Sequence, residues 1–292
     1  ALGAVAAARF SAVAASALIA WGGMVLAAAA ELVPNPEFDK GQDAPDGWRL
    51  SGGKGRWVDR QILEVTGTGK DSNDWRAEAC RFTPGGLYRF QMRARRIDGG
   101  GGCTISGPSF ANRDHTLPIG DWRWYGHVFR APDNPSGHYL RVGQWESPGT
   151  VQFDAVRLVP LLPVHHAAGG LLLGEGESIE NGLYVFRGTF EGQGSNFHRT
   201  LASATAGFNS DRWCFSGKDQ ATYRFGVPGH PFRSGQVSFH VNHYSRGACL
   251  AEVSRDQKEW RTVATKNGLG SAEARLPDGL FPADVLFLRL RT

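Results

Sequence analysis

Apolar and polar residues alternate in many short segments between residue 32 and residue 292. Residues 87–95 show the pattern clearly, because every even position from 88 to 94 is apolar and every odd position from 89 to 95 is Arg or Gln. A period of two predicts a β-strand with one face in a core and the other in water. We expect strands at 61–66, 75–82, 87–95, 124–130, 139–144 and 151–159, and then at 182–188, 211–215, 221–225, 235–242, 249–254, 261–264 and 285–291.

Turn sequences rich in Gly and Pro separate these segments, such as Thr-Pro-Gly-Gly at 83–86 and Ser-Pro-Gly at 147–149. Many short strands joined by such turns are typical of β-sandwich and jelly-roll folds. A chain of 292 residues is long enough for two such domains. Prolines followed by small residues are typical of a linker. We therefore predict an all-β chain with a β-sandwich at 32–160, a linker at 161–170 and a second β-sandwich at 171–292.

The first 31 residues differ from the rest, because Arg9 is the only charge before Glu31. The 21 uncharged residues of 10–30 are long enough for a transmembrane helix, which needs about 20 apolar residues. The alternative is a secretory signal peptide that is cleaved after the small residues 28–30. Small residues also let membrane helices approach closely, and we expect an uncleaved anchor that packs against other membrane helices. Its apolar residues are Phe10, Leu18, Ile19, Trp21, Met24 and Leu26.

The charges on either side of this segment predict its orientation. Arg9 precedes it, and the acidic residues Glu31 and Glu37 follow it. The positive-inside rule then places the N-terminus in the cytoplasm, with a single pass through a bacterial inner membrane and both domains in the periplasm. An even pair of cysteines in each domain is consistent with an oxidising compartment, with buried free thiols as the alternative. The candidate disulfide residues are Cys80, Cys103, Cys214 and Cys249.

Charge and motifs exclude several classes of function. The net charge of +4 is spread evenly, with 17 Lys and Arg against 16 Asp and Glu in residues 31–163, and 14 against 12 in residues 164–292. Without a basic stripe, we do not expect nucleic-acid binding. The chain contains no Walker loop, Rossmann fingerprint, G-x-S-x-G or H-E-x-x-H motif, and no pair of carboxylates stands out for glycoside hydrolysis. We therefore expect a protein without catalytic activity and without a required cofactor.

Residues 32–160 resemble carbohydrate-binding modules of the galactose-binding-like jelly-roll superfamily. The resemblance lies in Asn-Pro-Glu-Phe-Asp at 35–39 with Pro-Asp-Gly-Trp at 45–48, in Pro-Gly-Gly-Leu-Tyr-Arg-Phe at 84–90 followed by Arg93, and in Gly-Thr-Val-Gln-Phe-Asp-Ala-Val-Arg-Leu at 149–158. It implies the jelly-roll fold and specifies no ligand. In that family an acidic residue in the opening strand and an Asp in the closing strand often hold a structural calcium ion, for which carboxylate oxygens are suitable ligands. The matching positions are Asp39 and Asp154, and the alternative is that both carboxylates cap turns without a metal.

The second half resembles the same superfamily more loosely. Residues 232–239 and 252–260 are similar to matching strands of discoidin-like domains, with a hairpin turn near Asp256 and Gln257. The sequence departs from that pattern at Gln257, where Gly is usual. The resemblance implies a galactose-binding-like fold for this half and no ligand.

Aromatic residues are the most suggestive candidates for ligand contacts. Sugar-binding modules use exposed aromatic rings as flat surfaces, and protein interfaces also favour Trp and Tyr. Core packing is the alternative for each ring, and we assign Trp48 to the core. In a regular strand Trp122 and Trp124 share one face and Tyr125 lies on the other. The candidates for a ligand site or an interface are Trp57, Trp75, Trp122, Trp124, Tyr125 and Trp145.

Three functions are compatible with these features. The first is a non-catalytic structural subunit of a bacterial membrane complex, with the lipid bilayer and other membrane subunits as partners; an accessory subunit of a photosynthetic reaction-centre and light-harvesting assembly is one example. The second is a cell-surface carbohydrate-binding protein with a glycan as its partner, and the third is a glycan-processing enzyme. Fold alone does not choose among them. A cleft lined by two or more exposed Trp residues would favour sugar, and buried or covered aromatics would favour scaffolding.

Overall fold

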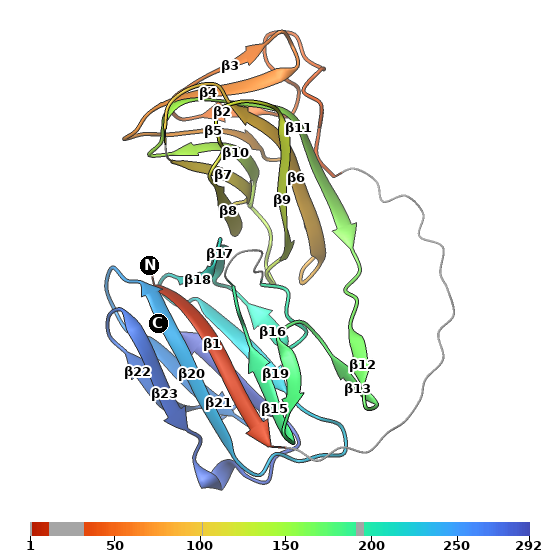
Figure 1. The fold of residues 1–292 in the computed structure, drawn as a ribbon, viewed down its shortest axis with the longest axis vertical. Helices are drawn as coiled ribbons and strands as arrows, with labels where there is room; N and C mark the ends of the chain where they lie inside the picture. The colour runs from red at the N-terminus through yellow and green to blue at the C-terminus, as the bar shows by residue number, and fades with distance from the viewer. Residues whose placement is uncertain (1, 12–31, 101, 191–195) are drawn as a thin grey trace. The chain divides into compact units, whose positions relative to one another are not determined.

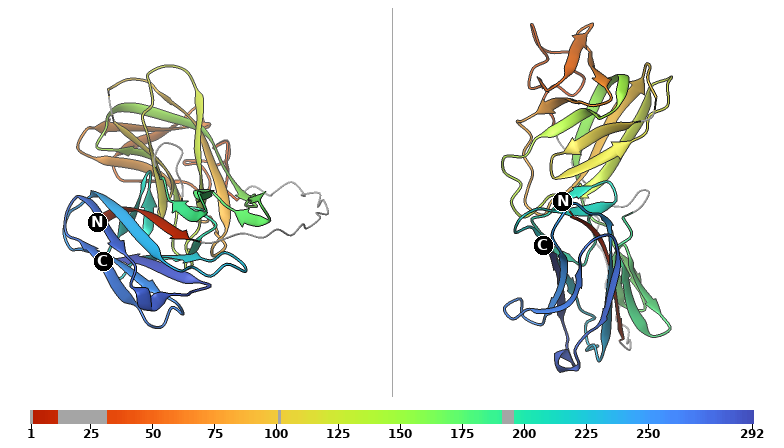
Figure 2. Two further views of the ribbon diagram at one scale, coloured as in Figure 1. Left: turned by 60° about the horizontal axis from the view of Figure 1, so that its bottom comes forward. Right: turned by 90° about the vertical axis from the view of Figure 1, so that its left-hand side faces the viewer.

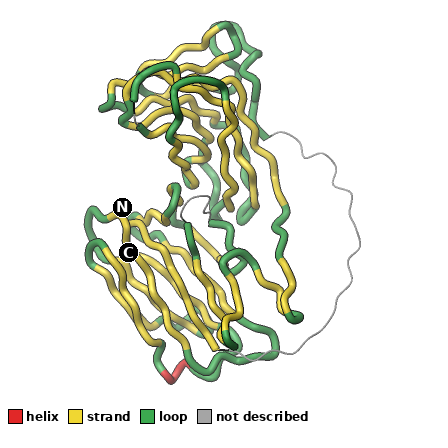
Figure 3. The backbone as a smooth tube through the Cα atoms, viewed as in Figure 1, coloured by secondary structure: helices red, strands yellow, loops and turns green. Residues whose placement is uncertain are grey.

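The computed structural model describes residues 2–11, 32–100, 102–190 and 196–292 of the chain. The chain divides into two compact units, Leu26–Leu162 and Ala1–Val25 with Pro163–Thr292. We call their described parts the first and the second domain. Strands predominate in both, and the helix in the described ranges is a single 3₁₀ turn, η1 (Asp278–Leu280) (Figure 3). The prediction of an all-β chain is confirmed.

Two antiparallel sheets form the first domain (Figure 1). The first sheet contains, in spatial order, β3 (Lys54–Val58), β4 (Ile62–Thr68), β11 (Pro148–Leu161), β6 (Leu87–Arg96) and β9 (Arg123–Arg130). The second sheet contains β2 (Arg49–Ser51), β5 (Ser72–Ala77), β10 (Leu140–Trp145), β7 (Cys103–Pro108) and β8 (Ala111–His115). We call the first of these the five-stranded face sheet, because its outer face carries the residues discussed below.

The alternation predicted for residues 87–95 decides which side of β6 enters the core. All the even residues from 88 to 94 are buried, while the odd residues from 89 to 95 are partly or fully exposed. Trp48 is buried as predicted, and its Nε1 donates a hydrogen bond to the Pro34 carbonyl oxygen over 2.9 Å. The outer face of the sheet is therefore polar, as the period of two requires.

The second domain also contains two larger sheets (Figure 2). One comprises β14 (Glu177–Glu180), β15 (Leu183–Arg187), β1 (Leu2–Ser11), β17 (Gly207–Asn209), β18 (Arg212–Phe215), β20 (Gly235–His243) and β23 (Gly270–Arg275). The other has the order β16 (Leu201–Ala204), β19 (Gln220–Phe225), β24 (Leu286–Arg291), β21 (Cys249–Ser254) and β22 (Arg261–Lys266). A separate hairpin consists of β12 (His166–Ala168) and β13 (Leu171–Leu173), so part of the expected linker 161–170 is a strand.

The membrane helix expected over residues 10–30 overlaps the described residues only at 10 and 11, where the prediction is wrong. Residues 2–11 form β1, which pairs with β15 and β18 along one edge and with β20 along the other. Phe10 pairs with Tyr184 and Gly235, so a residue assigned to the anchor lies in a sheet. An apolar, Ala-rich segment satisfies its backbone equally well between two strands, and hydropathy alone does not distinguish the two environments. The other anchor residues, Leu18, Ile19, Trp21, Met24 and Leu26, lie outside the described residues.

Within the ranges that the structure describes, no helix has the length and the hydropathy of a membrane span.

The predicted disulfides are absent, because all four cysteines are free thiols. Cys103 pairs with Trp145, which also pairs with Ser72 at the start of β5. Cys80 lies beyond Ala77, at the end of β5. Ser72 and Ala77 are about 17 Å apart at the rise of a β-strand, and bridged Cα atoms lie within about 7 Å of each other. In the second domain Cys249 is buried, while Cys214 alternates with the buried Trp213 and points away from the core. An even count per domain therefore did not imply proximity.

Gln257 lies in the turn of the hairpin between β21 and β22, where the sequence predicts a turn. Its φ of +62° lies in the left-handed region, which Gly adopts without steric cost. This explains why Gly is usual at the position. The turn is held instead by the Ser254 hydroxyl, which accepts a hydrogen bond from the Gln257 backbone N–H over 2.9 Å.

Candidate functional site

A row of polar residues crosses the outer face of the five-stranded face sheet. Arg56, Glu64, Gln152 and Arg95 lie opposite one another on four adjacent strands, from β3 to β6. We call these four residues the first polar row. Because successive strands lie about 4.8 Å apart, side chains in register across them can form a continuous chain of hydrogen bonds.

The first polar row is hydrogen-bonded from end to end. Arg56 Nε donates to Glu64 Oε1 over 2.5 Å, and Gln152 Nε2 donates to Glu64 Oε2 over 2.6 Å. Arg95 Nε donates to Gln152 Oε1 over 2.9 Å. The Gln152 amide thus donates on one side and accepts on the other, so every member has a fixed orientation. Such an arrangement holds its donors and acceptors ready for a ligand.

Two tryptophans stand beside this row. The Arg95 guanidinium carbon lies 4.6 Å from the centre of the Trp122 ring, and the Arg93 carbon lies 5.6 Å from it. The Arg157 guanidinium carbon lies 4.8 Å from the centre of the Trp124 ring. These distances are those of cation–π contacts. Trp124 remains 44% exposed, so much of its surface is open to a ligand.

A hollow of about 500 Å³ lies at the other end of the row. Its lining includes Lys54, Arg56, Glu64, Thr66, Asp98 and Gln152. The Thr66 and Thr150 hydroxyls lie 3.3 Å apart across β4 and β11 at its wall. The hollow has the volume of a small-molecule site and is lined by groups that donate and accept hydrogen bonds.

The Glu64 carboxylate is buried and stays ionised. Burial alone would raise the pKa of Glu64, but the hydrogen bonds from Arg56 and Gln152 and the charge of Arg56 outweigh it, so the pKa lies below its ordinary value. A general acid needs a raised pKa, so Glu64 is suited to orienting its neighbours and not to proton transfer.

Asp154 lies next to the row, where β11 contains one extra residue relative to β6. Arg93 Nη1 donates to Asp154 Oδ2 over 2.8 Å, while Oδ1 is buried without a hydrogen-bond partner. Burial raises the pKa of Asp154 above its ordinary value, although Arg93 partly offsets this. The described residues include no group of three His, Cys, Asp or Glu placed to hold a metal ion, and Asp39 is exposed. Calcium at Asp39 and Asp154 stays a prediction.

The other predicted aromatics are not brought to this face. Trp75 is buried and its Nε1 donates to the Glu64 carbonyl oxygen over 3.1 Å, while Trp57 Nε1 donates to the Phe38 carbonyl oxygen over 2.8 Å. Tyr125 lies on the opposite side of β9 from Trp124 and contacts His115 edge-on. Trp145 is 51% exposed at the end of β10, in the other sheet. Of the six candidates, only Trp122 and Trp124 share the polar face.

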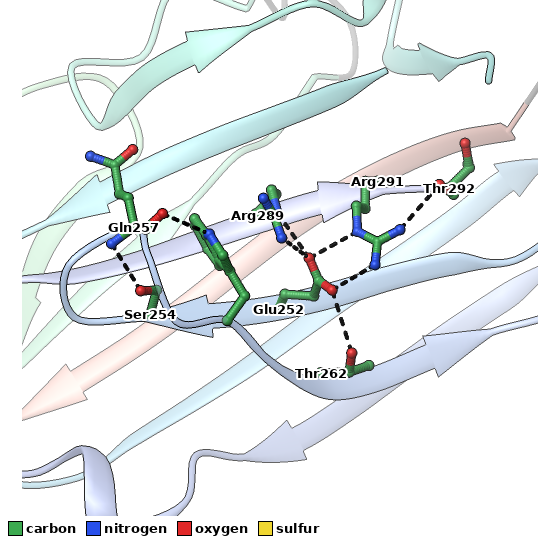
Figure 4. Close-up of polar contacts among 8 residues, drawn as sticks. Glu252, Ser254, Gln257, Thr262, Arg289, Arg291 and Thr292 are labelled. Carbon is green, nitrogen blue, oxygen red and sulfur yellow. Dashed lines mark hydrogen bonds and ion pairs between the residues drawn. The ribbon is translucent and has the colours of Figure 1, made fainter. Parts of the chain in front are cut away.

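The second domain carries a comparable set of residues on its sheet β16-β19-β24-β21-β22. Glu252 on β21 accepts hydrogen bonds from Arg289 Nε over 2.8 Å and from Arg291 Nε over 2.9 Å and Nη2 over 2.8 Å (Figure 4). Thr262 on β22 lies opposite Glu252. The Arg289 guanidinium carbon lies 4.0 Å from the centre of the Trp260 ring. We call Glu252, Thr262, Arg289 and Arg291 the second polar row.

Sequence reasoning missed both polar rows, although one signal was present. Glu64 lies between the apolar residues Leu63 and Val65, and Glu252 lies between the apolar residues Ala251 and Val253. A charged residue in the middle of a strand that faces a polar partner is a recognisable pattern. The identity of the partners depends on the register between strands distant in sequence, which the alternation does not specify.

No protein-family model matches the chain, and no curated protein matches its sequence. Among solved structures it is similar to the N-terminal CBM22-1-CBM22-2 tandem domain from Paenibacillus barcinonensis Xyn10C, with 14% identity, 92% of each chain covered and a TM-score of 0.35. It is also similar to the second N-terminal cellulose-binding domain of Cellulomonas fimi β-1,4-glucanase C, with 12% identity, 47% of this chain and 98% of that chain covered, and a TM-score of 0.34.

A third similar structure is TmCBM61 in complex with β-1,4-galactotriose, with 19% identity, 45% of this chain and 99% of that chain covered, and a TM-score of 0.30. These proteins are carbohydrate-binding modules, which is the class that the sequence resembles. Such low identities and TM-scores do not identify a ligand for this chain.

Proposed function

We propose that this protein binds polysaccharide without catalysis, and that the first domain does so on the outer face of its five-stranded face sheet. The observation that carries the proposal is the hydrogen-bonded first polar row, which has a hollow of about 500 Å³ at one end and two tryptophans at the other. The row crosses the strands in a straight line, which matches a linear chain of sugar units.

The chemistry of the row supports sugar as the ligand. Sugar hydroxyls both donate and accept hydrogen bonds, and planar amide, carboxylate and guanidinium groups offer both functions in a fixed plane. Glu64, Gln152 and Arg95 are already held by one another, so little side-chain entropy is lost when a ligand binds. The exposed part of Trp124 adds an apolar surface next to these groups.

A structural role in a membrane complex has less support. That prediction relied on a helical anchor, and residues 2–11 of the expected anchor are strand β1 instead. The criterion of a cleft lined by two or more exposed Trp residues is met only in part, because Trp124 is exposed, Trp122 is half-buried and neither ring lines the hollow.

Affinity electrophoresis of the full chain through gels that contain soluble polysaccharides tests the proposal. We expect retardation by at least one polysaccharide, and we expect Trp124→Ala to weaken binding roughly fivefold, since a ring contact contributes on the order of 1 kcal/mol. Trp145→Ala is the matched control, because Trp145 is similarly exposed but lies in the other sheet. The proposal fails if no polysaccharide retards the wild type, or if both variants weaken binding equally.

A further inference from the structure

The two polar rows share an arrangement that points to a specific class of polysaccharide. In each sheet the last strand of the domain, β11 or β24, lies in the centre. In each domain a tryptophan directly precedes an edge strand of that sheet: Trp122 precedes β9 and Trp260 precedes β22. Each of these rings has an arginine over it, and each row contains a buried glutamate. The two domains thus present the same three groups on equivalent faces.

Charge on these faces is unevenly exposed. Each row contains two arginines and one glutamate, so each has a formal excess of one positive charge. The glutamates lie beneath the arginines: the Glu64 side chain is 7% exposed and that of Arg56 is 71% exposed. At the rim Lys54 lies near Asp98, and Arg157 lies 3.7 Å from Glu37, so these charges largely offset each other. A ligand that approaches either row therefore meets guanidinium groups first.

The guanidinium groups over Trp122 and Trp260 favour an anionic ligand over a neutral sugar. A neutral pyranose stacks its apolar side on an open ring face, but a guanidinium already covers one face of Trp122 and of Trp260. The ring restricts the position of the guanidinium and leaves its N–H edge available. Arg95 uses Nε for Gln152, and its two terminal nitrogens can still donate to a carboxylate or a sulfate in a bidentate manner.

We infer that both polar rows bind acidic polysaccharide, whose uronate carboxylates or sulfate groups pair with Arg95 in the first domain and with Arg289 in the second. This inference rests on the proposed function and adds the charge of the ligand and a second binding face. Two faces on one chain that engage the same polymer raise the apparent affinity above that of either alone.

The test compares three polymers by affinity electrophoresis of the full chain: polygalacturonate carries carboxylates, dextran sulfate carries sulfates, and dextran is neutral. We expect retardation by at least one acidic polymer and none by dextran. The two acidic polymers distinguish carboxylate from sulfate as the favoured group. Affinity should fall by roughly fivefold when the salt concentration rises fourfold, because binding releases counterions from the polymer.

Two variants separate this inference from general attraction to a polyanion. Arg95→Gln and Arg289→Gln should each weaken binding to the acidic polymer and flatten the salt dependence. The matched controls Arg81→Gln and Arg246→Gln change exposed arginines that lie outside the rows, and they should bind as the wild type does. Urea denaturation checks that each variant is folded.

Three results would overturn the inference. Binding to dextran or other neutral glycans alone would contradict it and leave the proposed function intact. An equal loss in Arg81→Gln and in Arg95→Gln would show that the rows have no special part. Absence of binding to every acidic and neutral polysaccharide would contradict both the inference and the proposed function.

Discussion

Removing the Glu252 carboxylate should destabilise the second domain. The Glu252 side chain is 5% exposed and holds Arg289 and Arg291 through charge-assisted hydrogen bonds. In Glu252→Gln both guanidinium groups lose their counter-charge. Leaving a buried charge unpaired costs about 3–5 kcal/mol, and the side chains of these arginines are 20% and 37% exposed, so water compensates part of the loss. We expect a decrease of about 2–3 kcal/mol in the free energy of unfolding.

Urea denaturation measures this decrease when it is monitored by hydrogen exchange and mass spectrometry, because peptides from β21 and β24 report on the second domain separately. A midpoint shift of about 1–2 M urea corresponds to the expected change. Arg275→Gln is the control: its partner Asp278 lies 3.4 Å away and both side chains are more than three-quarters exposed, so the change should stay below about 0.5 kcal/mol. If Glu252→Gln shifts the midpoint no more than this control does, the second polar row does not stabilise the domain.

The pH dependence gives an independent check of the same interaction. Hydrogen bonds from Arg291 and Arg289 hold the pKa of Glu252 below its ordinary value, although burial opposes them. A group whose pKa is lower in the folded state stabilises the fold above its unfolded pKa, and this contribution is lost as the pH falls through the folded pKa. The wild type should therefore lose stability on acidification below about pH 4.3. Glu252→Gln should lack this part of the decrease, and an identical acid profile for both proteins would contradict the assignment.

Two further predictions concern the hairpin and the cysteines. Gln257→Gly should raise the free energy of unfolding by about 0.5–1 kcal/mol in urea denaturation, because the φ of +62° is strained for Gln and free for Gly; a decrease would contradict that explanation. All four thiols should react with a thiol reagent in denaturant without any reductant, while Cys80 and Cys249 should be protected in the folded protein, since burial raises the pKa of each to about 12. Fewer than four reactive thiols in denaturant would indicate a disulfide.

The alternation of residues was enough to predict the strand character of most of the chain. In β6 the period of two placed the apolar side chains in the core and the arginines outside. It also placed Trp122 and Trp124 on one side and Tyr125 on the other. These predictions succeed because side-chain direction in a strand is a local property of the backbone. Of the strands that were not predicted, β1 consists mostly of small apolar residues and β2 is only three residues long.

Pairing between distant strands decided the rest, and it is invisible in a local pattern. Whether the Ala-rich segment became a membrane helix or a strand depended on the free edges that β15 and β20 offer to residues 2–11. The cysteines remain unpaired because register placed them far apart or on opposite sides of a sheet. Gln152 meets both Glu64 and Arg95 because β11 inserts between β4 and β6, which joins residues up to 88 positions apart. The sequence determined which residues face outward, and only the tertiary structure determined which of them meet.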